Sequence, residues 1–78
     1  MMKKGKMILN ALKKRYEANI AEADAVIMEI LNNSVAVGEH TAKILEDLDK
    51  AITKKAENED KINSFQDFEK TLANEHTK

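Results

Sequence analysis

The sequence contains no cysteine and no proline, and its only two glycines are Gly5 and Gly38. Without cysteine, neither a disulfide framework nor a thiolate metal site can stabilise the fold. Aromatic residues make up only 4% of the chain, which argues against a β-sheet. A chain so poor in helix-breaking residues favours a few long helices. We therefore predict an all-α fold and, for 78 residues, a single domain.

Several functional signatures are also missing. No apolar run approaches the roughly 18 to 20 residues of a membrane span, and residues 1–12 lack the apolar centre of a secretory signal. These absences lead us to expect a soluble, cytoplasmic protein. The chain has no glycine-rich phosphate loop, no nucleophile elbow and no Cys/His constellation. We therefore predict a protein that is not an enzyme and binds no cofactor.

Helical periodicity dominates what is present. Between Leu9 and Leu31 the large apolar residues recur in steps of three and four, the helical period. At about 100° per residue they span an arc of about 140°, which is wider than one neighbouring helix covers. The pattern predicts a first helix over about residues 6–31, a connection over 32–40, a second helix over about 41–72 and frayed termini. We expect Asn32, Asn33 and Ser34 to end the first helix and Thr41 to cap the second.

Two amphipathic helices joined by a short connection favour an antiparallel hairpin. Placing Leu31 opposite Thr41 brings Lys13 opposite Glu59, and the acids of residues 57–60 beside basic residues 13–15. This register agrees with the charge distribution, because residues 1–16 carry six basic residues and no acid, whereas residues 17–78 carry seven lysines and fourteen acids. We therefore expect the two halves of the chain to attract each other.

Two helices cannot enclose a core, and an isolated pair of this size is marginally stable. A second copy would bury the remaining apolar surface, so the sequence favours a homodimeric four-helix bundle, with a different protein partner as the alternative. The residues expected in the core and dimer interface are Leu9, Leu12, Tyr16, Ile20, Ile27, Ile30, Leu48, Ile52, Ile62, Phe65 and Phe68.

The basic N-terminal segment supports a second interpretation, contact with the phosphate backbone of a nucleic acid. Against it, Tyr16 is the only aromatic residue near the lysines that could stack on a base, and acids of the second helix are expected to neutralise part of the charge. The possible contact residues are Lys3, Lys4, Lys6, Lys13, Lys14 and Arg15.

Glu39 and His40 lie in the connection, where they could act in acid–base chemistry, hold a metal, or serve as first-turn residues of the second helix. The other histidine, His76, falls at the opposite end of the predicted hairpin. A di-metal carboxylate bundle needs Glu-x-x-His on facing helices, and this motif does not occur. We therefore predict no metal site.

Two short motifs carry a resemblance. The run from Arg15 to Ala23, RYEANIAEA, and the run from Val37 to His40, VGEH, resemble a group of small uncharacterised proteins of T-even-type tailed phages of marine cyanobacteria and related marine bacteria. The resemblance covers about residues 9–62 and implies two helices joined by a connection ending in G-E-H. The group often has proline after this motif, where this chain has Thr41. The resemblance suggests a phage origin and implies no activity.

We therefore predict a non-enzymatic helical interaction protein that acts as a homo-oligomer. The alternatives are an accessory protein of phage replication or recombination that contacts nucleic acid, and a small inhibitor of a host enzyme. No membrane partner is expected.

Overall fold

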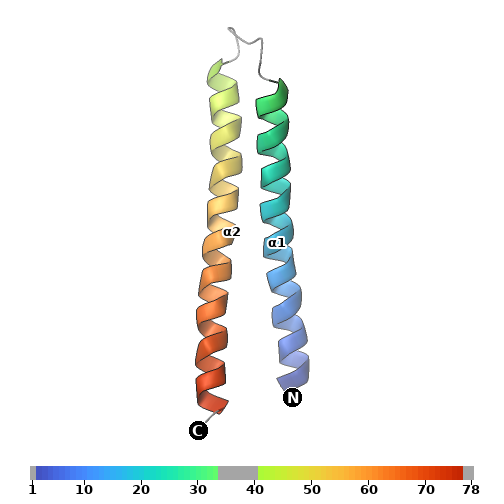
Figure 1. The fold of residues 1–78 in the computed structure, drawn as a ribbon, viewed down its shortest axis with the longest axis vertical. Coiled ribbons are helices and arrows are strands. Elements are labelled where there is room, and N and C mark those ends of the chain that lie inside the picture. Colours follow the sequence, from blue (N-terminus) through green and yellow to red (C-terminus); the bar gives the residue numbers. More distant parts are fainter. Residues whose placement is uncertain (1, 34–40, 77–78) are drawn as a thin grey trace.

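The chain forms two long antiparallel helices that pack side by side (Figure 1). Helix α1 spans Met2–Asn33 and α2 spans Thr41–His76 in the computed structural model. The structure describes residues 2–33 and 41–76, with side chains for 4–33 and 41–72. The hairpin is a rod with principal extents of 61 × 17 × 13 Å. The predicted all-α hairpin is confirmed.

Both helices are longer than the sequence pattern predicted. Helix α1 begins four residues before Lys6 and continues two residues past Leu31, and α2 continues four residues past Leu72. Gly5 does not stop α1, because one glycine weakens a helix by only about 1 kcal/mol relative to alanine. The chain has no proline that would end either helix. The roles expected for Ser34, Glu39 and His40 fall on positions outside the described residues.

The seam between the helices follows a seven-residue repeat. Its buried members are Ala23, Ala51, Asn58 and Phe65, with exposed fractions of 1%, 7%, 5% and 8%. This spacing is typical of helices that cross at a small angle and interlock their side chains. In α1 the repeat comprises Leu9, Tyr16, Ala23 and Ile30, and in α2 it comprises Ile44, Ala51, Asn58, Phe65 and Leu72.

The register of the hairpin differs from the predicted one. Residue numbers of facing pairs add up to 77 for Asn19 with Asn58 and to 76 for Glu22 with Lys54, whereas the prediction was about 72. The predicted pairing of Lys13 with Glu59 is therefore wrong by about five residues, or roughly 7 Å along the helix axis. Part of the reason is that α1 continues to Asn33 before the chain turns. The contacts of Asn19 with Asn58 and of Glu22 with Lys54 then fix the position of α1 along α2.

Helix-end electrostatics contribute little to this fold. Helix α1 has no acidic residue in its first turn and no basic residue in its last turn, so its dipole is not compensated by side-chain charge. At its C-terminal end, the Asn33 side-chain amide donates a 3.0 Å hydrogen bond to the carbonyl of Glu29. Stability must therefore come mainly from packing along the seam.

The seam leaves no room for larger side chains at its centre. We predict that Ala23→Leu destabilises the protein by about 1 to 3 kcal/mol, because leucine would overpack a site that is 1% exposed. Urea unfolding followed by circular dichroism, at one fixed protein concentration, measures this. The control is Ala25→Leu, an exposed position of the same helix, where we expect no loss. Equal stability of the two variants would contradict the tight contact at Ala23.

Candidate interaction surface

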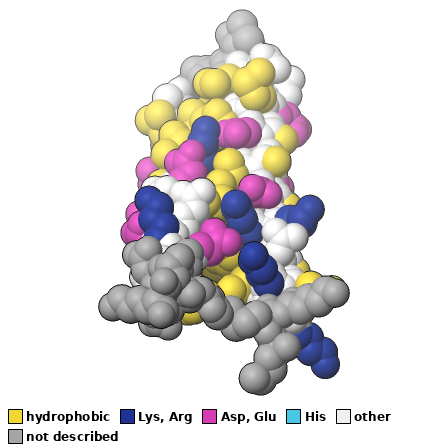
Figure 2. Space-filling model, turned by 60° about the horizontal axis from the view of Figure 1, so that its bottom comes forward, with side chains coloured by type: hydrophobic (Ala, Val, Ile, Leu, Met, Phe, Trp, Pro, Cys, Tyr) yellow, Lys and Arg dark blue, Asp and Glu magenta, His cyan; other side chains and the backbone are white. Residues whose placement is uncertain are grey.

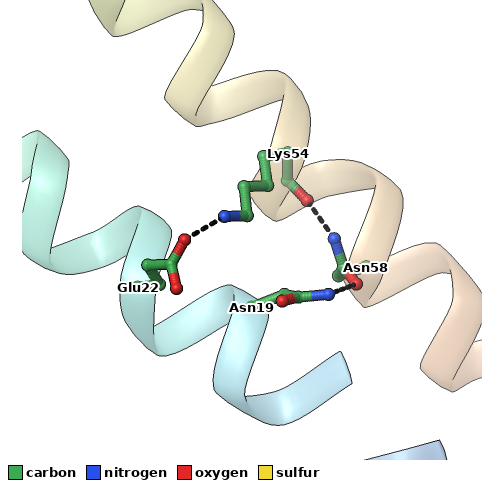
Figure 3. A network of polar contacts seen from close by, with 4 residues as sticks. All are labelled: Asn19, Glu22, Lys54 and Asn58. Carbon is green, nitrogen blue, oxygen red and sulfur yellow. Dashed lines mark hydrogen bonds and ion pairs between the residues drawn. The ribbon is translucent and has the colours of Figure 1, made fainter. Parts of the chain in front are cut away.

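A polar network lies in the middle of the seam (Figure 3). The Asn19 side-chain amide donates a 3.0 Å hydrogen bond to Oδ1 of Asn58. In turn, Nδ2 of Asn58 donates to the Lys54 carbonyl at 2.7 Å. The Lys54 ammonium also pairs with the Glu22 carboxylate across the helices. The buried Asn58 amide thus has partners for both its donor and its acceptor, which removes the penalty for burying it.

A second ion pair joins the helices close to the first. Nζ of Lys55 lies 2.8 Å from Oδ1 of Asp24. Because successive helical residues are rotated by about 100°, Lys54 and Lys55 lie on opposite sides of the seam. We call these two sides the Lys54 face and the Lys55 face. Figure 3 shows the Lys54 face, with α1 on the left and α2 on the right. Figure 1 has α2 on the left and α1 on the right, so it shows the molecule from the opposite side.

Each ion pair shifts the pKa of one of its two side chains. The hydrogen bond and charge of Lys54 lower the pKa of the Glu22 carboxyl from its ordinary value. The hydrogen bond and charge of Asp24, with a smaller contribution from Glu59, raise the pKa of Lys55. All four paired side chains are more than one third exposed, so the pairs favour one register and contribute little stability.

The two faces differ in composition. Helical rotation from the seam places a set of large apolar residues on the Lys55 face. Of these, Leu31, Leu45 and Ile52 are 53%, 61% and 53% exposed. The Lys54 face carries the polar network and fewer large apolar residues, namely Ile8, Leu12, Val26 and Phe68. The apolar set of the Lys55 face consists of Ile20, Ile27, Leu31, Leu45, Leu48, Ile52 and Ile62.

The predicted interface residues have different degrees of burial in the single chain. Phe65 is buried, and three of the eleven, Leu12, Ile52 and Phe68, are exposed at 38%, 53% and 52%. The other seven are half-buried: Leu9, Tyr16, Ile20, Ile27, Ile30, Leu48 and Ile62.

Sequence reasoning missed the two asparagines of the seam. Asn58 lies seven residues from both Ala51 and Phe65, so the repeat itself could have located it. It was overlooked because it falls inside a run of polar residues, from 57 to 61. Leu31 and Leu45 were also left out of the predicted interface, although both are more than half exposed.

Among side chains 4–33 and 41–72, no ion pair joins the N-terminal basic residues to the acids of α2. In the register of the structure, the acids of residues 57–60 lie at the level of residues 17–20. Within 4–33 and 41–72, the cross-helix ion pairs join lysines of α2 to acids of α1, the reverse of the prediction. Lys4, Lys6, Lys14 and Arg15 are exposed and Lys13 is half-buried, while the side chain of Lys3 lies outside the described part. Tyr16 instead contacts Lys61, whose Nζ lies 5.6 Å from the ring centroid.

The hollows on the surface are shallow grooves along the seam. One of about 590 Å³ lies on the Lys54 face near the connection, between Val26, Ile30, Ile44 and Lys54. Another of about 570 Å³ is bordered by Tyr16, Phe65 and Phe68. Among the side chains that the structure describes, no three His, Asp or Glu groups gather as they would around a metal ion. The side chains of Glu39, His40 and His76 are outside that part.

The fold therefore places the chain in the class of two-helix hairpins. Comparison with protein-family models, curated proteins and solved structures found no match. Neither described helix has an apolar segment long enough to cross a bilayer.

The asparagine pair provides a test of the seam. We predict that Asn19→Ala costs about 1 to 3 kcal/mol of unfolding free energy, because it leaves Oδ1 of the 5% exposed Asn58 without its donor. Asn10→Ala, at an exposed site of α1, should change stability by less than about 0.5 kcal/mol. Replacing both Asn19 and Asn58 by leucine should restore or exceed the original stability, since no polar group is then buried. Chemical denaturation at fixed concentration distinguishes these outcomes, and a harmless Asn19→Ala would refute the network's contribution.

Proposed function

We propose that this hairpin is a non-enzymatic interaction protein that functions as a homodimer, in which two copies complete a four-helix bundle. One observation carries the proposal. Within the described side chains, three apolar residues are buried, whereas nine large apolar residues are between 38% and 67% exposed. Scattered exposed apolar residues are ordinary on protein surfaces, but Leu31, Leu45 and Ile52 share the Lys55 face, and exposed apolar residues that share a face mark an interaction site.

The size of the chain supports the same proposal. A single pair of helices buries too little apolar surface to offset the conformational entropy lost on folding about 70 residues. A closed two-fold dimer buries the same patch on both copies, so each exposed apolar residue contributes twice. On the resemblance of its motifs, we further propose a phage origin and action in the cytoplasm of the infected host.

Sedimentation analysis over a wide concentration range tests the dimer. We predict a species of twice the 8.8 kDa chain mass that dissociates on dilution. Ile52→Lys should raise the dimer dissociation constant at least about tenfold, since it puts a charge at an apolar site that is 53% exposed in the single chain. Thr53→Lys, the exposed neighbour directed away from α1, is the matched control and should change the constant little. A folded monomer at every concentration, with full helical circular dichroism, would end the proposal.

A second function, nucleic-acid contact, is favoured by a separate observation. The acids of α2 lie about five residues away from the position at which they were expected to neutralise Lys13, Lys14 and Arg15. The first four turns of α1 therefore carry a basic segment in which Lys4, Lys6, Lys14 and Arg15 are exposed and Lys13 is half-buried. Such a segment can contact a phosphate backbone, and its affinity falls steeply with added salt because releasing counterions from the nucleic acid then gains less entropy.

Anisotropy of a fluorescently labelled single-stranded oligonucleotide tests this candidate. We predict binding at low salt that weakens with added salt and is lost when Lys13, Lys14 and Arg15 are all changed to Glu. The control changes three exposed lysines of α2, Lys43, Lys50 and Lys70, to Glu, which alters the net charge equally outside the basic segment. No binding at low salt, or equal loss in both variants, would exclude specific use of this segment.

A further inference from the structure

We infer that the second copy docks on the Lys55 face and that the two hairpins lie with their connections at the same end. This inference rests on the proposed homodimer and specifies its surface and geometry. The occupant is therefore another copy of this chain, related by a two-fold axis that runs along the rod.

The choice of face follows from polarity. On the Lys54 face, the seam is covered by the Asn19–Asn58 pair and by the Glu22–Lys54 ion pair. Burying that face would desolvate a charged pair whose members are 66% and 39% exposed, at a cost that hydrophobic contact has to exceed. The Lys55 face also carries one ion pair across the seam, but it lacks the asparagine pair and has the larger apolar set, so burying it gains more hydrophobic contact for a similar cost of desolvating charge.

The direction of the copies follows from where the apolar residues lie along the rod. Facing pairs have residue numbers that add up to about 77, so Ile27 and Leu31 of α1 lie near the levels of Leu48 and Leu45 of α2. This half of the rod adjoins the connection, and Figure 2 shows hydrophobic side chains gathered toward it, with charged side chains nearer the termini. A two-fold axis along the rod places the apolar half of one copy against the apolar half of the second copy. A two-fold axis perpendicular to the rod at its midpoint would instead place the apolar half of each copy against the charged half of the other copy.

Charge complementarity favours the same arrangement. A two-fold axis along the rod places α1 of one copy opposite α2 of the other without changing any level. Asp24 and Lys55 share a level, because their side chains are joined at 2.8 Å. Asp24 of each copy then lies opposite Lys55 of the second copy, so the two ion pairs can combine into a cluster of alternating charge at the centre of the interface.

The face is also large enough for a stable dimer. The two longer principal extents of the hairpin are 61 and 17 Å, so overlap of two hairpins along their whole length exceeds the roughly 800 Å² per partner of a typical specific interface. Docking with the connections at the same end is the arrangement that overlaps the faces along their whole length while matching the apolar halves.

Two α1 variants test the choice of face. Leu31→Lys, on the Lys55 face, should raise the dimer dissociation constant at least about tenfold, whereas Val26→Lys, on the Lys54 face, should change it less than about threefold. Both positions are exposed in the single chain, at 53% and 41%, so neither variant should prevent folding, and circular dichroism verifies this. Greater sensitivity at Val26 than at Leu31 would overturn the choice of face.

Electron-spin distance measurements test the direction. The chain has no cysteine, so Lys43→Cys near the connection and Lys70→Cys near the termini each give a single labelling site per copy. With connections at the same end, both label-to-label distances should be below about 30 Å, the width of a four-helix bundle plus the label arms. With connections at opposite ends, the 1.5 Å rise per residue makes at least one of the two distances about 40 Å or more, wherever the axis falls.

These results separate the two proposals. A wild-type monomer in sedimentation would remove the proposed homodimer itself. A dimer with one long spin distance would keep the proposed function and overturn the same-end geometry.

Discussion

The close contact of the two helices at Ala23 and Ala51 is the constraint on which the rest of this structure depends. Small side chains at these positions let the helix axes approach, and every seventh residue then falls on the same line of contact. The position of this line determines which residues stay exposed. The residues on its two sides form two faces that differ in composition. The difference between the Lys54 face and the Lys55 face is thus a product of helical rotation about one narrow seam.

Polar contacts give this seam its alignment. An all-apolar line of contact would tolerate sliding by one repeat, because seven residues later the same kinds of side chain meet again. Asn58 cannot slide without losing both hydrogen bonds, and a buried amide without partners is costly. The ion pairs from Lys54 and Lys55 are too exposed to add much stability, but each is satisfied in one register only. Hydrophobic burial therefore drives the association of the helices, and the asparagine pair with its flanking ion pairs sets their alignment.

The helical period and the absence of proline were sufficient to predict the all-α hairpin, because both are local properties of the chain. Register was not predictable in the same way. It depends on which residues meet across two helices. Placing Leu31 opposite Thr41 predicted Lys13 opposite Glu59, whereas the structure pairs lysines of α2 with acids of α1. Asn58 lies in a polar run and looked solvent-exposed, although its spacing from Ala51 and Phe65 marks it as a seam residue. The exposure of Leu31 and Leu45 was not predictable for the same reason. It depends on the side from which the neighbouring helix packs, and periodicity alone does not determine that side.

The seven-residue repeat also restricts how a chain of this kind can change in length. Removing seven residues from each helix shortens the rod by about 10 Å and returns every remaining side chain to its former azimuth, so the surviving contacts are rebuilt. Removing one residue from a single helix turns everything beyond the deletion by about 100° and carries asparagine and isoleucine to the wrong sides. Hairpins of this kind can therefore gain or lose seven residues in both helices together and keep their contacts. Insertion or deletion of single residues disrupts these contacts.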